Sequence, residues 1–402
     1  MLGVLTRPWN SSEATWAVGG AFALVLSGLV PWPDALAAVR KGNDVYMFLV
    51  GMMLLSELAR RAGLFEQLAA VCVHHARGSA MRLFALVYGL GTLVTIFMSN
   101  DATAVVLTPA VLAVTRHAKA RPLPYLLACA LIANAASFVL PISNPANLVI
   151  FGDKLPPLSH WFGRFALPSA AAIAATFWVL ARLHRSELSG CIANGSSPVP
   201  FSRAAVLAAA GIGVSAIVLL AASALGQPLG GPSLLCGVVL CGIVRAVERV
   251  PLRDVVAHVS WPVLLLVAGL FVMVEGLQRV GVLQSLASLL HSAMTHSADA
   301  TALSAGVVVA FACNLLNNLP VGLVAGSVVG SDGVHPLLQS AVAIGVDLGP
   351  NLSVTGSLAT ILWLMALRRE GEHVSAWQFL KVGMVAMPVA LVAALGALML
   401  KA

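Results

Sequence analysis

Phe97-Met98-Ser99-Asn100-Asp101-Ala102-Thr103 interrupts a long apolar run, and about 215 residues later Leu316-Asn317-Asn318-Leu319-Pro320 interrupts another. A second pair of polar interruptions, at Pro141–Asn147 and Gly349–Ser357, has almost the same separation. At membrane depth, such breaks in helical backbone survive only where protein or a wet cavity satisfies the freed polar groups. Interrupted hydrophobic segments at matching places in two halves are the best sequence pointer to the binding site of a transporter. We therefore expect this chain to move a small polar solute.

The composition indicates a membrane protein. The chain is 59% hydrophobic and 10% charged, whereas a soluble domain has roughly 25% charged residues. Several windows hold the roughly 20 apolar residues that span hydrocarbon, among them Phe165–Leu183, Trp261–Leu277 and Phe379–Leu400. The apolar window nearest the N-terminus, Trp16–Val30, lacks the small-residue cleavage site of a secretory signal, so we expect it to be kept as a membrane helix. The whole chain should form one polytopic helical bundle.

The 23 lysines and arginines predict a topology. The net charge of +7 does not indicate nucleic acid, because the bases lie at helix ends rather than in a patch with aromatic residues. With a cytoplasmic N-terminus, and with the Asp101 segment as a hairpin that enters and leaves one face, 17 of the 23 face the cytoplasm. The segment around Asn317 is flanked by Asp299 and Asp332 and should enter from outside. This topology has nine crossings, two re-entrant hairpins and a periplasmic C-terminus.

The two halves match in residues as well as in breaks. Four residues recur at an offset of 218: Gly51, Glu57, Arg61 and Gly63 return as Gly269, Glu275, Arg279 and Gly281. Asn100 aligns with Asn317 at 217, which pairs Asp101 with Asn318. Asn134 aligns with Asp347 at 213. Because each unit has an odd number of crossings, we expect an all-α polytopic membrane protein, an inverted-repeat transporter with two re-entrant hairpins and two broken transmembrane helices.

The predicted organisation has five parts: an N-terminal segment 1–15, a first inverted repeat 16–184, a cytoplasmic linker 185–202, an extra transmembrane helix and connection 203–229, and a second inverted repeat 230–402. In the first repeat the hairpin tip is predicted near 99–103 and the helix break at 141–147. In the second repeat the corresponding positions are 317–320 and 349–357.

Two acidic residues, Asp101 and Asp347, lie in apolar surroundings without a local base. A charged group at the centre of a membrane helix costs roughly 2.5–3.5 kcal/mol on insertion scales, so each acid needs a partner or a purpose. The structural alternatives are capping of the helix that restarts at Ala102 and hydrogen bonding to backbone at the second break. Since desolvation favours the neutral form of a carboxyl group, we expect one or both acids to carry a coupling proton.

Two other acids have a base on the same helix face. Glu57 precedes Arg61 by four positions, and Glu275 precedes Arg279 by the same spacing. This is the favourable order for an ion pair in a helix, and we interpret both as structural pairs.

The expected substrate contacts are the amides and hydroxyls at the tips and breaks: Ser99, Asn100, Thr103, Asn134, Asn144, Asn147, Asn317, Asn318, Thr355 and Ser357. Such groups can donate to and accept from a neutral polyol-like solute. A multiply charged anion would call for Arg or Lys, and the breaks contain neither. The N-termini of the half-helices still favour partial negative charge. Any one of these polar groups could instead serve only to satisfy broken backbone.

Phe97–Thr103 with Leu107-Thr108-Pro109, Leu316–Pro320 and the stretch from Val346 to Trp363 resemble the ArsB arsenite and antimonite efflux permeases. These belong to the ion transporter superfamily, which also holds dicarboxylate carriers and sodium/proton antiporters. The resemblance covers nearly the whole chain. It implies efflux of arsenite and antimonite across a bacterial inner membrane in exchange for protons, without a cofactor, and it allows for a cytoplasmic ATPase subunit. Arsenous acid at neutral pH is an uncharged triol, which suits the amides and hydroxyls.

Two alternatives stay open. Another carrier of the superfamily, such as a sodium/proton antiporter or a dicarboxylate carrier, would share the hairpins. Asn144-Pro145-Ala146 spells the motif of aquaporin-type channels, but the second break reads Gly356-Ser357-Leu358-Ala359, and a passive pore has no use for two buried acids. An enzyme is not expected, because the sequence has no G-x-S-x-G, H-E-x-x-H or phosphate-loop motif. The six cysteines are scattered without C-x-x-C spacing, so no metal centre is predicted.

Overall fold

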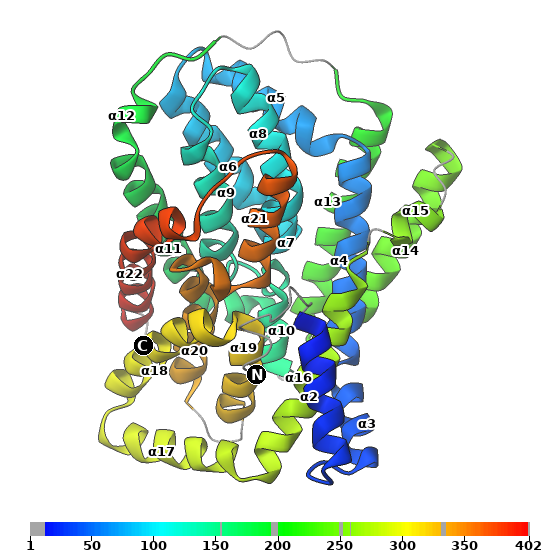
Figure 1. The fold of residues 1–402 in the computed structure, drawn as a ribbon, viewed down its shortest axis with the longest axis vertical. Helices are drawn as coiled ribbons and strands as arrows, with labels where there is room; N and C mark the ends of the chain where they lie inside the picture. Colours follow the sequence, from blue (N-terminus) through cyan, green and yellow to red (C-terminus); the bar gives the residue numbers. More distant parts are fainter. Residues whose placement is uncertain are drawn as a thin grey trace.

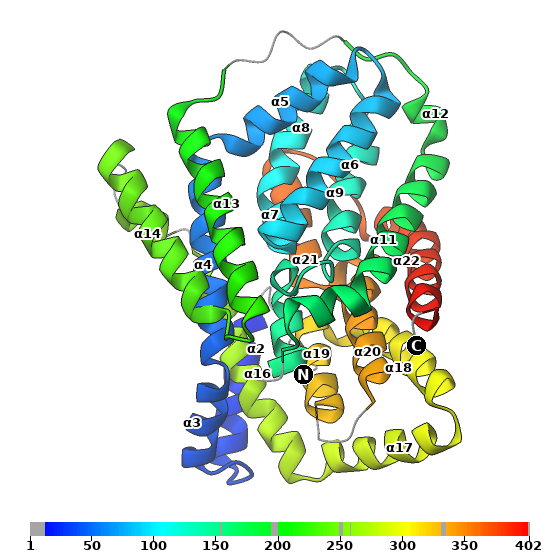
Figure 2. The ribbon, with the colours of Figure 1, turned by 180° about the vertical axis from the view of Figure 1, so that it is seen from behind.

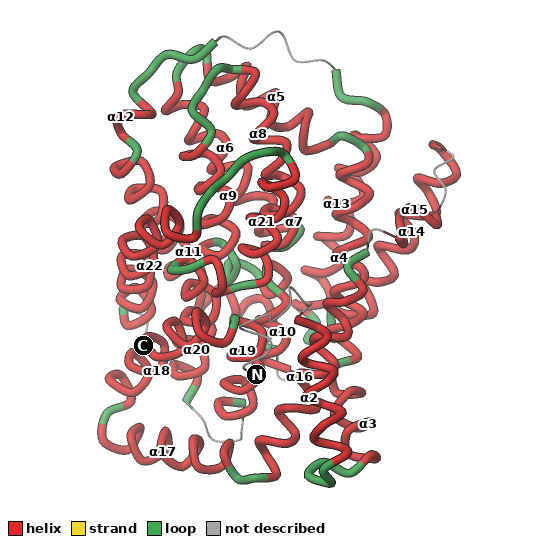
Figure 3. Tube along the Cα trace, viewed as in Figure 1, coloured by secondary structure: helices red, strands yellow, loops and turns green. Residues whose placement is uncertain are grey.

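The computed structural model describes residues 13–152, 155–193, 200–248, 252–257, 259–330 and 335–400. Within these ranges the chain is built from helices joined by short connections, and no strand is present (Figure 3). Seven of the described helices are long and apolar enough to cross a membrane. The chain is therefore an all-α polytopic membrane protein, as the composition predicts.

The helices fall into two groups (Figure 1). The first group, which we call the flanking bundle, packs α4 against α14 and α16 against α2. Its members are α2 (Glu13–Leu26), α3 (Trp32–Lys41), α4 (Asn43–Arg61), α13 (Arg203–Ala224), α14 (Gly230–Glu248), α15 (Leu252–Ala257) and α16 (Trp261–Arg279).

The second group, the hairpin bundle, contains both interrupted hairpins and both broken helices. Its members from the first repeat are α6 (Ala80–Phe97), α7 (Asn100–Ala102), a π turn (Thr103–Leu107), α8 (Thr108–His117), α9 (Leu123–Ala135), α10 (Pro145–Phe151), α11 (Leu158–Leu183) and α12 (Arg185–Leu188). Those from the second repeat are α18 (Ala298–Leu316), α19 (Asn318–Val329), α20 (Pro336–Leu348), α21 (Leu358–Arg369) and α22 (Ala376–Met399). Helices α11 and α22 pack against each other and join the two repeats.

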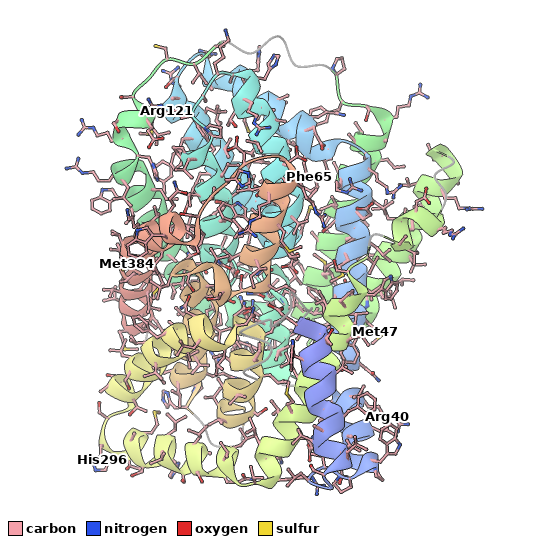
Figure 4. The ribbon with its side chains drawn as sticks, viewed as in Figure 1. Arg40, Met47, Phe65, Arg121, His296 and Met384 are labelled. Carbon is pink, nitrogen blue, oxygen red and sulfur yellow. The ribbon has the colours of Figure 1, made fainter. Side chains whose placement is uncertain are left out.

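Two helices connect the bundles at opposite ends of the molecule (Figures 1 and 2). Helix α5 (Leu64–Ala76) follows α4 at one end, and α17 (Val282–His296) follows α16 at the other. Gly63 and Gly281 precede them with positive φ angles of 67° and 80°, a left-handed conformation that glycine adopts without strain. We call these the α5 end and the α17 end. Figure 4 shows Arg121 toward the α5 end, and Arg40 and His296 toward the α17 end.

The helix boundaries repeat along the chain. The offset of 218 residues relates the starts of α4 and α16, of α5 and α17, of α6 and α18, and of α7 and α19. The first hairpin (α6–α8) points inward from the α5 end and the second (α18 and α19) from the α17 end, as inverted repeats require (Figure 1). That these hairpins are re-entrant in a bilayer, and that the chain makes nine crossings, stay predictions.

The structure corrects the alignment of the two tips. Asn100 opens α7 and Asn318 opens α19, so these two residues correspond at 218. The predicted pairs of Asn100 with Asn317 and of Asp101 with Asn318 are wrong, and Asp101 corresponds to Leu319. Each tip carries adjacent polar residues, and polarity alone does not tell which of them ends the first arm.

The broken helices are α9–α10 and α20–α21, related by an offset of 213. The second break runs from Gly349 to Ser357, between the end of α20 and the start of α21. The first break lies earlier than the predicted 141–147, because α9 ends at Ala135 and α10 begins at Pro145. Proline is compatible with the first position of a helix, where its missing N–H has no partner to lose, so Pro145 starts a helix here.

Candidate functional site

The first hairpin turns at Ser99, whose φ of 141° reverses the chain between α6 and α7. Asn100 and Asp101 then open the second arm. Thr103, predicted to bind substrate, is fully buried, and its hydroxyl lies 2.8 Å from that of Thr95 on α6. Thr103 therefore holds the two arms of the hairpin together rather than facing a cavity.

The second hairpin turns at Asn317, which has a φ of 68°. Its Oδ1 accepts a hydrogen bond from the backbone N–H of Leu319 at 3.3 Å, which caps α19. Its Nδ2 is buried and has no partner among the described residues. Asn318 follows as the first residue of α19.

Asn144 and Ser357 cap the second halves of the two broken helices. Asn144 Oδ1 accepts from the N–H of Ala146 at 3.0 Å, and its Nδ2 donates to Asp347 Oδ1 at 2.6 Å. Ser357 Oγ accepts from the N–H of Thr360 at 3.1 Å. The two caps occupy the same position of their repeats at the offset of 213.

The two tips and the two breaks meet at the centre of the molecule, around a small cavity of about 20 Å³ that we call the central pocket. It is lined by Asn100 and Asp101 of the first tip, Asn318 and Leu319 of the second, Asn144 and Pro145 of the first break, and Ser357, Leu358 and Ala359 of the second. Leu49 of α4 and Val263 of α16 close it from the flanking bundle. The described residues that line it include no base.

A larger cavity of about 620 Å³, which we call the vestibule, lies between α4 and the first hairpin. Ser99 and Asp101 line its inner part, and Asp101 also lines the central pocket. The charged residues that line the rest of it are Glu57, Arg60, Glu66, Arg369 and Glu370. These lie at the ends of α4 and α21 and the start of α5, toward the α5 end of the molecule (Figure 1). Asp101 thus stands where the vestibule meets the pocket.

Asp347 occupies a different environment. Its side chain is fully buried, Oδ1 accepts the short hydrogen bond from Asn144, and Oδ2 has no partner among the described residues. It lines neither the central pocket nor the vestibule. In this conformation Asp347 reaches the pocket through the Asn144 side chain that it holds.

Three other predicted contacts face protein groups. Asn134 donates to Asn351 Oδ1 at 3.0 Å, which ties the first broken helix to the second break. Asn147 donates to the carbonyl of Ser137 at 2.9 Å. Thr355 donates to the carbonyl of Asn314 at 3.0 Å.

Two amides that the sequence did not single out bind backbone carbonyls near the breaks. Asn351 donates to the carbonyl of Leu131, and Asn314 donates to the carbonyl of Gly349 at 2.9 Å. The signal for Asn314 was available, since it is an amide inside an apolar helix one turn before a tip.

The two predicted ion pairs are present in the flanking bundle. Arg61 Nε lies 2.6 Å from Glu57, and Arg279 Nε lies 3.7 Å from Glu275. Each arginine also reaches the other repeat, because Arg61 donates to the carbonyl of Asp254 on α15 and Arg279 pairs with Asp34 on α3. The two clusters are related by the internal symmetry and tie the repeats together. Arg60, which the sequence reading did not select, also binds Glu57 at 2.7 Å.

Comparison with known proteins agrees with this architecture. The chain is 25% identical to the arsenical pump membrane protein of Escherichia coli over 99% of its own length and 96% of the relative. It is 24% identical to the putative arsenical pump membrane protein of Bacillus subtilis over 97% of this chain and 94% of that one. The predicted resemblance to arsenical permeases is confirmed.

A solved structure shares the fold. The YdaH transporter of Alcanivorax borkumensis, whose crystal structure reveals an unusual topology, superposes with a TM-score of 0.59 at 17% identity, covering 91% of this chain and 86% of that one. A family model named CitMHS and described as citrate transporter matches residues 2–346. The chain therefore belongs to the CitMHS family of membrane transporters.

Proposed function

We propose that this chain exports trivalent arsenic and antimony hydroxides in exchange for protons. The central pocket carries this proposal: amides, one hydroxyl and one acid from both tips and both breaks surround a space without a base. Amides and hydroxyls both donate and accept, which suits an uncharged triol. The names of the arsenical relatives support arsenic as the element.

The proton is exchanged at Asp101 in this proposal. Asp101 lines both cavities, so a proton arriving through the vestibule and a solute in the pocket can reach the same carboxyl group. The ionised carboxylate accepts hydrogen bonds from the hydroxyls of the solute. Protonation removes much of that acceptor capacity and releases the solute, which makes binding of the proton and of the solute mutually exclusive. Asp347 contacts Asn144 instead, so we assign it the task of holding that amide.

The membrane potential can drive such an exchange. One proton entering for one neutral solute leaving moves one net charge inward, worth about 2.3 kcal/mol per 100 mV. A factor of ten corresponds to 1.4 kcal/mol, so 100 mV could support a concentration gradient of roughly fiftyfold.

Uptake into everted membrane vesicles tests the proposal. Arsenite, antimonite, succinate, citrate and sodium are compared side by side, with a pH gradient imposed or collapsed. We expect saturable uptake of arsenite and antimonite that stops when the proton gradient and the membrane potential are both collapsed. Saturable uptake of succinate, citrate or sodium without a response to arsenite would instead identify another carrier of the superfamily. If arsenite equilibrates across the membrane at a rate that does not depend on the proton gradient, the protein is a passive channel.

A further inference from the structure

The N-termini of two helices, which carry the positive ends of the helix dipoles, line the central pocket. Helix α19 begins with Asn318 and Leu319, and α21 begins with Leu358 and Ala359, and all four residues line the pocket. Each helix has 12 residues, and the aligned peptide dipoles of a helix place about half a positive charge at its N-terminus. Without other charges, the backbone here would favour an anion.

Asp101 places a negative charge in that position. It is the one ionisable side chain among the described residues that line the pocket. Leu49 and Val263 close the pocket with apolar side chains, so the field of the helix ends and of the carboxylate is poorly screened there. The equivalent position in the second repeat is Leu319, so this charge belongs to one repeat alone.

A second observation points to a ligand that donates hydrogen bonds. Asn100 Oδ1 belongs to a buried side chain that lines the pocket, and it has no partner among the described residues. A neutral trihydroxide brings O–H donors for this oxygen and for the Asp101 carboxylate. A carboxylate anion brings acceptors only and would meet the charge of Asp101.

We propose that Asp101 sets the charge selectivity of the pocket, which deepens the proposed function and rests on it. Its carboxylate supplies the negative charge that the N-termini of α19 and α21 favour. The pocket therefore binds an uncharged hydroxide and repels carboxylate anions. Without that charge, the same pocket binds a carboxylate anion. We therefore expect Asp101 to exclude citrate, the solute that the family description names, from this pocket.

The other charged groups that face Asp101 are the same in the wild type and in a variant with a neutral residue at position 101. They are the residues of the vestibule: Glu57, Arg60, Glu66, Arg369 and Glu370. The pocket of about 20 Å³ has room for about one water molecule. Either solute can therefore place one hydroxyl or carboxylate group in the pocket beside Asp101, while the rest stays in the vestibule, which Asp101 also lines.

Thermal unfolding of the purified full chain in detergent tests the proposal through binding alone. Wild type, Asp101→Asn and the charge-retaining Asp101→Glu are each titrated with arsenite and with citrate, at an ionic strength held constant with sodium chloride. We expect arsenite to raise the Tm of the wild type and of Asp101→Glu, and citrate to leave both unchanged. In Asp101→Asn, citrate should raise the Tm, and the apparent affinity for arsenite should fall at least tenfold. Asp101→Ser is a second neutral variant, judged in the same way if Asp101→Asn does not unfold cooperatively.

Three results would overturn one or the other of the two claims. Arsenite binding by the wild type, with no citrate response in either neutral variant, rejects the charge-selectivity role and leaves arsenic export standing. A citrate response in the wild type equal to that of Asp101→Asn also rejects the role. If citrate stabilises the wild type and arsenite does not, the proposed function itself fails.

Discussion

At the residue scale, the contact between Asp347 and Asn144 decides how the second buried acid takes part. The 2.6 Å hydrogen bond fixes Asn144, which lines the central pocket and caps α10. The capping bond uses Asn144 Oδ1, so the Asp347 contact determines where the amide nitrogen points. The carboxyl group of Asp347 reaches the pocket only through the Asn144 side chain, whereas Asp101 lines the pocket itself.

Asp347→Asn should therefore keep uphill export within about threefold of wild type, because the amide oxygen of the new side chain can still accept from Asn144. Asp347→Ala should leave the Asn144 nitrogen buried without a partner. A buried amide without a partner costs about 1–3 kcal/mol, so KM should rise roughly fivefold to 150-fold. Transport kinetics across pH separate the two roles, since a positioning residue changes KM without moving the pH profile. Loss of uphill export in Asp347→Asn, with downhill exchange intact, would show that Asp347 carries the proton.

The matching change at Asp101 should behave differently. Asp101→Asn removes the proposed proton carrier, so arsenite movement should no longer respond to an imposed pH gradient in everted vesicles. The rate of the residual downhill flux should be the same at every external pH between about 6 and 8. Accumulation driven by pH in this variant, as strong as in the wild type, would exclude Asp101 as the carrier.

At the element scale, the hairpins are held in the bundle by backbones that approach closely. Gly306 of α18 lies against α20, and a Cβ added there would lie 2.8 Å from the carbonyl oxygen of Ala341. Gly345 of α20 faces Gly306 from the other side. Small residues permit this approach between membrane helices, where packing rather than the hydrophobic effect drives association.

Gly306→Ala should destabilise the protein because the new methyl group has no room against backbone. Overpacking of this kind typically costs about 1–3 kcal/mol. Gly396→Ala in α22 is the matched control, since nothing lies within 4 Å of a Cβ at that position. The Tm of both variants is measured in detergent. We expect the Tm of Gly306→Ala to fall, and that of Gly396→Ala to stay the same or rise slightly because alanine has a better helix propensity than glycine. Equal Tm values for the two variants would contradict the prediction, because they would mean that α18 and α20 can move apart to accommodate the methyl group at little cost.

At the scale of the whole molecule, the two hairpins enter from opposite ends, and the α5 end carries the basic turn after α8 (Figures 1 and 4). From the positive-inside rule we expect the α5 end to be cytoplasmic. We propose a bacterial inner-membrane protein with its N-terminus in the cytoplasm and its C-terminus in the periplasm. The vestibule then opens toward the cytoplasm, from which an exporter takes its solute.

Single cysteines in a Cys-free background test this orientation on intact cells with an impermeant thiol reagent. Lys119 lies exposed at the α5 end and Thr295 at the α17 end. We expect Thr295→Cys to be labelled and Lys119→Cys to be protected until the cells are opened. The reverse pattern would invert the topology. Labelling at Gly195, Asp332 and Ala402, which lie outside the described residues, extends the test: the first should be protected and the other two labelled.

The sequence by itself determined the class, the repeat and the regions of the site. Hydrocarbon offers no water to satisfy polar groups, so helix-breaking and polar residues inside apolar runs are informative wherever they occur. For that reason both tips, the second break and the acids Asp101 and Asp347 could be located without coordinates.

The tertiary structure alone decided which of these polar groups face the pocket. Asn134, Thr103 and Thr355 satisfy the same sequence criterion as Asn100, yet they bind Asn351, Thr95 and the Asn314 carbonyl. A buried amide or hydroxyl needs a partner whether that partner is a solute or broken backbone, so composition cannot separate the two roles. The rotation of each half-helix about its axis separates them, and that rotation is fixed by packing between repeats far apart in the sequence. The same packing brings Asp101 to both cavities and leaves Asp347 behind Asn144.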